Sequence, residues 1–208
     1  MYADAIKTKL RAYYNREAEY RNSGEKQDWK IRQREAFYKL TILENKKTLL
    51  EIGAGTGQDS RYFMDHGLKV LAIDLSGEMV RICKEKNIEA YEFDMYDLFA
   101  INRKFDCVWS MNSLLHIPKS DLKKVLIGIE SVLNENGLFY MGVYGGEDSE
   151  GYWTNDISET PRFFSYYSES KIKEVLQSVF EIMAFTQFDV GRNIEFQSII
   201  MRRTIGSK

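Results

Sequence analysis

A glycine-rich stretch, preceded by one carboxylate and followed by two more, is the part of this sequence best suited to bind a ligand. Glu51 precedes the run GAGTG at 53–57, and the residues LLEIG that lead into it are mostly apolar, as in a buried strand. Glycines between a strand and a helix permit positive φ angles and let the backbone approach a ligand closely. Because open α/β sheets bind ligands at the carboxyl ends of their strands, this stretch predicts a nucleotide-like cofactor.

The two later carboxylates end the next two predicted strands. Asp74 closes KVLAIDL, where a carboxylate can accept hydrogen bonds from both hydroxyls of a ribose. Asp94 follows IEAYEF, where it can accept from an adenine amino group; its structural alternative is to cap the turn at 95–99. Glu51 also has a structural alternative, in which it accepts backbone N–H groups from the loop, and the two roles are compatible.

The glycine spacing separates two cofactor classes. A dinucleotide fingerprint is GxGxxG, but here the third glycine, Gly57, comes one residue early and Gln58 occupies the fingerprint position. The spacing therefore argues against an oxidoreductase with a nicotinamide cofactor, which we keep as an alternative.

Together, the segments EIGAGTG, AIDL and EFDM resemble the class I S-adenosylmethionine-dependent methyltransferases, in particular the small-molecule group that includes the quinone-biosynthesis enzymes. The resemblance covers residues 48–144 motif by motif and the rest by order of elements. It implies in-line transfer of a methyl group from S-adenosylmethionine to a nitrogen or oxygen atom of a small-molecule acceptor, without a metal. With the strand acid included, it implies a cofactor site formed by Glu51, Gly53, Ala54, Gly55, Gly57, Asp74, Leu75, Asp94, Met95 and Ser110.

The elements that must position these residues alternate from residue 48 onward. Apolar runs predict strands at 48–53, 69–75, 88–93, 105–111 and 137–144. Helices are expected after Gly57, Ser76 and Ser120 and near Ser168. The runs 181–190 and 196–203 leave no room for a crossover helix and predict an antiparallel hairpin. The predicted fold class is α/β: a Rossmann-like, seven-stranded, mostly parallel sheet with a C-terminal antiparallel hairpin strand and helices on both faces.

The length of 208 residues suits one domain, and no linker composition divides it. Within that single domain we expect four parts: an N-terminal helical lid at 1–47, a cofactor-binding core at 48–144, an acceptor-side loop at 145–167, and a C-terminal helix and hairpin at 168–208.

The candidates for acceptor chemistry lie around the predicted methyl position. His116 follows the fourth strand and is the candidate general base; the alternative is that it only forms a wall of the pocket. Tyr14, Tyr144 and Trp153 could line the acceptor site, and Arg162 could hold an acceptor carboxylate or phosphate. The acids within 145–167 could instead favour a cationic acceptor, or simply pair with a basic N-terminal segment.

Composition narrows the class of partner. The net charge of −2 disfavours nucleic acid, although residues 1–47 carry 12 Lys/Arg against 7 Asp/Glu. From this basic segment, a Lys or Arg within residues 26–34 is expected to reach the carboxylate of the cofactor, with Arg34 as one candidate. Cys83 and Cys107 form neither a disulfide framework nor a zinc motif. We find no signal-peptide core and no membrane-spanning run, so we expect a cytoplasmic monomer or homodimer that binds no membrane.

Two readings of function stay open beside the methyltransferase and the oxidoreductase. One is a non-catalytic module that binds S-adenosylmethionine or S-adenosylhomocysteine. The other is a methyltransferase whose acceptor is a protein side chain.

Overall fold

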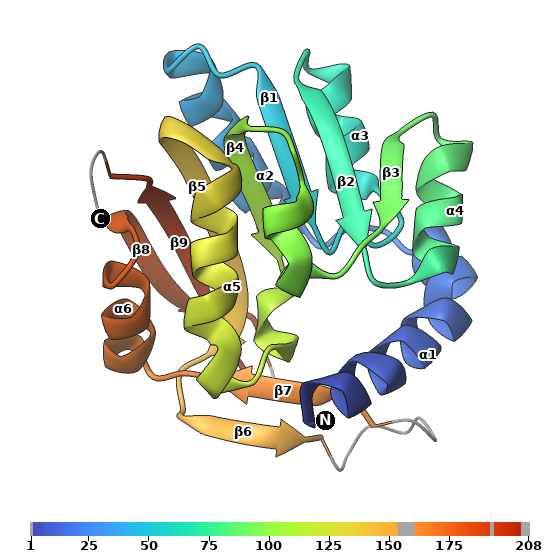
Figure 1. The fold of residues 1–208 in the computed structure, drawn as a ribbon, viewed down its shortest axis with the longest axis vertical. Coiled ribbons are helices and arrows are strands. Elements are labelled where there is room, and N and C mark those ends of the chain that lie inside the picture. Colours follow the sequence, from blue (N-terminus) through green and yellow to red (C-terminus); the bar gives the residue numbers. More distant parts are fainter. Residues whose placement is uncertain (1, 154–160, 192–193, 205–208) are drawn as a thin grey trace.

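The computed structural model describes residues 2–153, 161–191 and 194–204. Its main sheet has seven strands: β1 (Thr48–Ile52), β2 (Lys69–Asp74), β3 (Glu89–Glu92), β4 (Phe105–Met111), β5 (Leu133–Gly145), β8 (Glu181–Asp189) and β9 (Glu195–Arg202). Their spatial order is β3-β2-β1-β4-β5-β9-β8, shown in Figure 1. The first five are parallel, whereas β9 is antiparallel to both β5 and β8. The predicted fold class, including the C-terminal hairpin, is confirmed.

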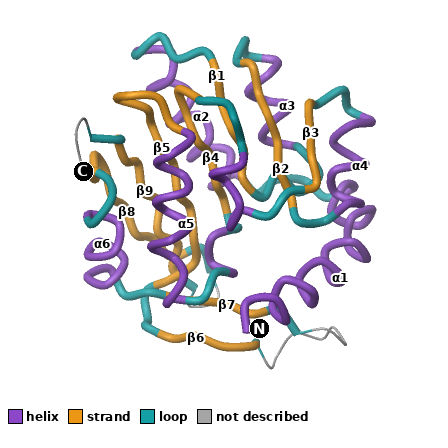
Figure 2. The backbone as a smooth tube through the Cα atoms, viewed as in Figure 1, coloured by secondary structure: helices purple, strands orange, loops and turns teal. Residues whose placement is uncertain are grey.

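Helices cover both faces of this sheet, as the tube in Figure 2 also shows. They are α1 (Tyr2–Ser23), α2 (Asp28–Leu43), α3 (Gln58–Asp65), α4 (Gly77–Glu85), α5 (Lys119–Val132) and α6 (Glu169–Gln177), with short 3-10 helices η1 (Met95–Ala100) and η2 (Leu114–His116). Neighbouring strand residues point to opposite faces. Accordingly, Leu50 and Val108 pack with α5 and α6, whereas Leu49 and Trp109 pack with α2 and α3.

The packing under α2 and α3 is aromatic and includes one buried polar contact. The rings of Trp109 and Tyr140 stack with centroids 3.9 Å apart, and Phe37 of α2 and Phe63 of α3 pack on Trp109. The indole nitrogen of Trp109 donates to Asp59 of α3 at 3.1 Å, so this buried donor is satisfied. This contact fixes the start of α3 against the sheet.

The segment at 145–167, predicted as a loop, contains a small two-stranded sheet. Strands β6 (Ser149–Tyr152) and β7 (Phe163–Tyr166) are antiparallel, and residues 154–160 between them lie outside the described residues. Phe163 packs on Ile6 and Leu10 of α1, so this sheet lies against the first helix, at the bottom of Figure 1. The local pattern did not show this pairing because it depends on contact with a helix some 150 positions earlier in the sequence.

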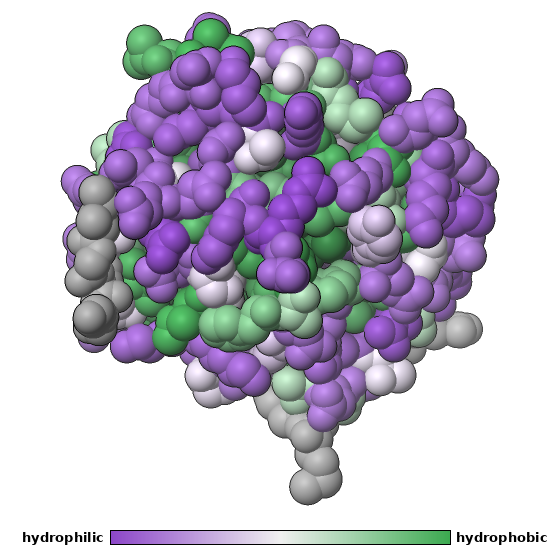
Figure 3. All heavy atoms as spheres, turned by 45° about the horizontal axis from the view of Figure 1, so that its top comes forward, coloured by the Kyte–Doolittle hydropathy of each residue, from purple (hydrophilic) through white to green (hydrophobic). Residues whose placement is uncertain are grey.

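The face of the molecule in Figure 3 is mostly hydrophilic, with hydrophobic residues exposed in small groups. No helix among the described residues is both long and apolar enough to cross a membrane.

Candidate functional site

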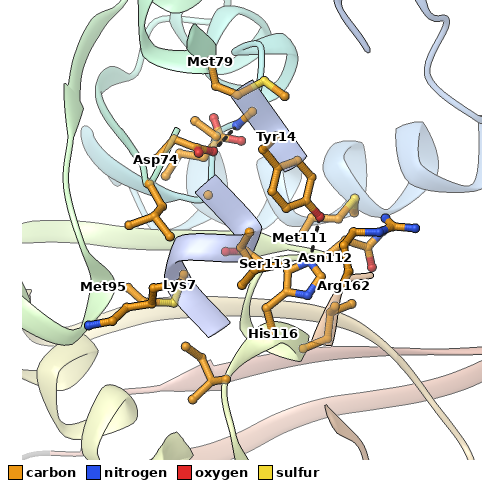
Figure 4. A pocket seen from close by; sticks show the side chains of 18 of the residues that line it. Lys7, Tyr14, Asp74, Met79, Met95, Met111, Asn112, Ser113, His116 and Arg162 are labelled. Carbon is orange, nitrogen blue, oxygen red and sulfur yellow. Dashed lines mark hydrogen bonds between the residues drawn. The ribbon is translucent and has the colours of Figure 1, made fainter. Parts of the chain in front are cut away.

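A cavity of about 370 Å³ lies at the carboxyl ends of β1, β2, β4 and β5. α1 and the start of α2 close one side of it, and the residues leading into β7 close another (Figure 4). This is the place where an open parallel sheet binds ligands, and the volume lies in the range of small-molecule sites.

The glycine turn after β1 brings backbone to the cavity wall. Gly53 and Gly55 both line the cavity with positive φ angles, of 71° and 56°. A Cβ atom on Gly53 would lie 2.1 Å from the hydroxyl oxygen of Ser113, so only glycine fits between β1 and the end of β4. A Cβ on Gly55 would meet nothing within 4 Å, which leaves that side of the loop open to a ligand.

The third glycine of the motif lies elsewhere. Gly57 is absent from the cavity lining; a Cβ there would meet Ile88 at 2.5 Å and Cys83 at 2.9 Å. It permits close packing of the start of α3 against α4. Gly57 therefore has a packing role, and its expected cofactor contact stays a prediction.

The carboxylate of Asp74 lines the cavity at the end of β2. It accepts from the backbone N–H groups of Gly55 and Ser76, both at 2.8 Å. Burial raises the pKa of Asp74, while these two backbone hydrogen bonds act in the opposite direction. The bonds hold the carboxylate and the glycine loop in one fixed arrangement. A carboxylate has about four acceptor positions, so capacity remains for a ligand hydroxyl.

Asp94 combines its structural alternative with a place in the cavity. Its side chain accepts from the backbone N–H of Tyr96 at 3.0 Å and so caps η1. It also forms an ion pair with Lys7 of α1, at 2.9 Å between Nζ and Oδ2. All three residues line the cavity, and Lys7 was not anticipated from the sequence.

Glu51 and Asp59 form a buried acidic pair behind the glycine turn. Glu51 accepts a hydrogen bond from the hydroxyl of Ser60. Burial, with the nearby charge of Asp59, raises the pKa of Glu51 to about 8. Asp59 is compensated by Lys26 at 2.7 Å and by Arg34 at 3.1 Å. Arg34, expected near the cofactor carboxylate, is thus held by Asp59 and is not part of the cavity lining.

His116 is held from both sides in the cavity wall. Its Nδ1 lies 2.7 Å from the carbonyl oxygen of Phe163, and its Nε2 lies 2.7 Å from the hydroxyl of Tyr14. A carbonyl oxygen can only accept, so Nδ1 carries a proton. In the neutral imidazole, Nε2 then accepts from the tyrosine hydroxyl. Figure 4 shows this pair between α1 and the end of the fourth strand.

The remaining predicted residues divide into two groups. Tyr144 and Arg162 line the cavity with Tyr14 and His116, and on the cofactor side so do Ala54, Leu75 and Met95. Ser110 and Trp153 do not. Ser110 is buried within β4, one residue short of the cavity, where Met111 and Asn112 take its place. Trp153 is 41% exposed and does not line the cavity, although its ring packs edge-on against Phe164, which does.

Three basic side chains of the N-terminal part also line the cavity: Arg21, Lys26 and Lys30, from α1, the connection after it and the start of α2. Lys26 and Lys30 belong to the stretch 26–34 from which a contact to the cofactor carboxylate was expected, whereas Arg21 was not anticipated. Burial and the charges of the other two cations lower the pKa of Lys30 to about 8. The basic composition of residues 1–47 was the available signal, but it does not indicate which basic side chains face inward.

Comparisons with known proteins relate part of this chain to methyltransferases. Residues 49–137 match the family described as "Methyltransferase domain". A malonyl-[acyl-carrier protein] O-methyltransferase of Hamiltonella defensa is 28% identical over 134 residues, which cover 62% of this chain and 51% of that protein. The chain spans about half the length of the curated relatives it matches.

Two solved structures show the same fold. The 1,6-didemethyltoxoflavin-N1-methyltransferase of Burkholderia thailandensis has a TM-score of 0.72 at 20% identity, over 95% of this chain and 88% of that one. The N-methyltransferase NodS of Bradyrhizobium japonicum has a TM-score of 0.67 at 12% identity, over 91% and 98%. Residues 49–137 of this chain are therefore similar to the methyltransferase domain family, and the chain shares the fold of these two methyltransferase structures.

Proposed function

We propose that this chain binds S-adenosylmethionine in the cavity and transfers its methyl group to a nitrogen or oxygen atom of a small-molecule acceptor. One observation carries the proposal: a single cavity joins the glycine turn and Asp74 on one wall to the Tyr14–His116 pair on the other. The Burkholderia and Bradyrhizobium structures named above both contain S-adenosylhomocysteine, the product of such a transfer.

The residues present fit this cofactor. Asp74 would accept from the ribose hydroxyls, and Asp94, with Leu75 and Met95, would hold the adenine. The open side of the loop at Gly55 leaves room for a ligand against the backbone. When bound, S-adenosylmethionine supplies an activated methyl group, so positioning by the protein accounts for much of the rate.

On the acceptor side, the chain provides a route for a proton. An acceptor hydroxyl or ammonium group would donate to the oxygen of Tyr14, while Tyr14 passes its own proton to Nε2 of His116. Burial raises the pKa of Tyr14, so the tyrosine does not ionise alone and needs the imidazole. The carbonyl of Phe163, which accepts from Nδ1, stabilises the imidazolium that results.

The first test is thermal. We expect S-adenosylhomocysteine to raise the melting temperature by roughly 5–10 °C, because ligand at about 100 times its Kd stabilises the native state by about 2.7 kcal/mol. NADH should have no effect, and the rise should vanish in Asp74→Ala. No rise at saturating S-adenosylhomocysteine would sink the proposal. A rise without methylation of any acceptor in a broad small-molecule screen would leave a binding module instead.

A further inference from the structure

The charges that line the cavity are separated by wall. The acids of the cavity lie on the wall formed by the glycine turn, α3 and the ends of β2 and β3. Each of these acids already has partners. They are Ser60 for Glu51, Lys26 and Arg34 for Asp59, backbone N–H groups for Asp74, and Lys7 for Asp94. No acidic residue is among those that line the opposite wall, within the part of the chain that the structure describes.

That opposite wall carries two guanidinium groups beside the Tyr14–His116 pair. Arg21, in the last turn of α1, lies 5.0 Å from the ring centroid of Tyr14. Arg162, just before β7, lies 4.6 Å from the centroid of Tyr13 and points to the same part of the cavity as Tyr14 (Figure 4). The positive charges of both arginines act on the Tyr14 hydroxyl. The ring faces of Tyr14 and Tyr13 therefore position the guanidinium groups of Arg21 and Arg162.

Arg21 forms no ion pair with a described carboxylate, although its charge acts on Asp74, in the direction opposite to the burial that raises the pKa of that group. Among residues 2–153, 161–191 and 194–204, no Asp or Glu side chain lies within ion-pair distance of Arg21. Lys30 lies close enough that the charges of Lys26 and Arg21 help lower its pKa. Crowded cations in a partly buried site are costly unless an anion compensates them.

Two acids of the segment after β5, Asp148 and Glu150, have partners away from the cavity, and the exposed Glu147 does not line it either. Asp148 pairs with Lys119 of α5 and Lys171 of α6. Glu150 accepts from the backbone N–H of Lys119 at 2.7 Å and from Ser165. These bonds hold Asp148 and Glu150 at α5 and α6, and neither acid lines the cavity. Asp156 and Glu159, which were also considered for a cationic acceptor, lie outside the described residues.

We infer that the methyl acceptor carries a carboxylate or phosphate group, and that Arg21 and Arg162 bind this group next to Tyr14 and His116. The inference rests on the proposed function. A guanidinium presents donors in a fixed fork that matches the oxygens of a carboxylate or phosphate, so two such groups can also orient the acceptor. Tyr144 and Phe164, which line the same end, provide apolar ring surface for the rest of the molecule.

The test uses protein saturated with S-adenosylhomocysteine, so that the cofactor and its own carboxylate are already in place. Benzoate and phenyl phosphate serve as acidic probes, with benzamide as the neutral isostere of benzoate, and calorimetry gives each Kd. We expect both acids to bind at least roughly tenfold more tightly than benzamide. Arg21→Gln and Arg162→Gln should each weaken acid binding by roughly tenfold or more.

Matched variants show whether the effect is specific. Arg16→Gln changes another arginine of α1 that also lies near the Tyr13 ring, at 5.8 Å, but is outside the cavity lining, and it should leave all affinities unchanged. Arg21→Lys should recover part of the lost affinity. An unchanged Kd for S-adenosylhomocysteine and an unchanged melting temperature without ligand would show that the arginine variants are folded.

Three outcomes would overturn the inference. They are equal binding of benzoate and benzamide, no acid binding up to millimolar concentration, and loss of S-adenosylhomocysteine affinity in Arg21→Gln with benzoate affinity intact. The last outcome would assign Arg21 to the carboxylate of the cofactor. Failure of the wild-type protein to bind S-adenosylhomocysteine is a separate result, which would remove the proposed function and this inference with it.

Discussion

His116 is fixed by partners on both ring nitrogens, and this decides where it can take up a proton. Phe163 occupies Nδ1 through its backbone carbonyl, so only Nε2 is available, and Tyr14 covers it. The histidine is also buried, at 7% exposure, so we expect an acceptor to meet the tyrosine first. Base and pocket wall, the two roles considered for His116, are thus compatible in one geometry, and in the proposed reaction Tyr14 is the group that touches the acceptor.

We predict that Tyr14→Phe lowers kcat by roughly 100-fold with any acceptor that must lose a proton, because the route to His116 is cut. The Kd for S-adenosylhomocysteine should change little. Tyr20→Phe is the matched control, since Tyr20 lies on the same helix and is 77% exposed. Rapid-quench measurement of a single turnover gives the chemical step directly, and an unaltered rate in Tyr14→Phe would refute the relay.

At the scale of elements, the turn from β1 to α3 shows that equivalent residues in a motif can have different structural requirements. Gly53 and Gly55 both have positive φ angles, but only Gly53 is pressed against the chain that follows β4. Gly53 also donates its backbone N–H to Ile73 of β2 at 2.8 Å. The turn is therefore held between two strands at its first glycine and is open at the second.

This contrast makes a paired prediction. Gly55→Ala should cost about 1–2 kcal/mol of unfolding free energy, the ordinary penalty for a left-handed conformation. Gly53→Ala should cost more, by about 1–3 kcal/mol, because the added methyl group also collides with Ser113. Urea unfolding of the two variants measures the difference, and equal losses would show that Ser113 moves aside freely.

At the scale of the whole molecule, buried ionisable groups between the sheet and α2 couple stability to pH. Burial raises the pKa of Glu51 from 4.5 to about 8 in the folded chain. The folded state therefore holds a proton that the unfolded state has released between these two pH values. The favourable contribution of this proton to the free energy of unfolding is complete below about pH 4.5 and is lost as the pH rises through about 8.

We predict that Glu51→Gln removes the loss of stability that Glu51 causes as the pH rises. The melting temperature of Glu51→Gln minus that of the wild type should increase steadily from pH 5 to pH 8, as measured by calorimetry at constant ionic strength. Glu174→Gln, a change on the exposed face of α6, should give a difference independent of pH. A flat difference for Glu51→Gln would mean that Glu51 is ionised in the folded protein at neutral pH.

The sequence by itself determined the order of the strands and helices of the main sheet, its antiparallel end and the wall that carries Asp74, Asp94 and the glycine turn. These features are local: strand runs are contiguous, and a ligand-binding residue at the end of a parallel strand follows its strand directly in the sequence. The family resemblance rested on these same segments, and the matched region, residues 49–137, coincides with them.

Only the tertiary structure decided the opposite wall. Tyr14 and His116 are 102 positions apart, and their hydrogen bond depends on how α1 packs across the strand ends and against β7. The same packing brings Arg21 to the cavity, whereas Gly57 is used against α4 and Trp153 is left outside. Such contacts join the surfaces of separate elements. The periodicity within one helix or strand does not specify which of its polar side chains will face a partner that lies far away along the chain.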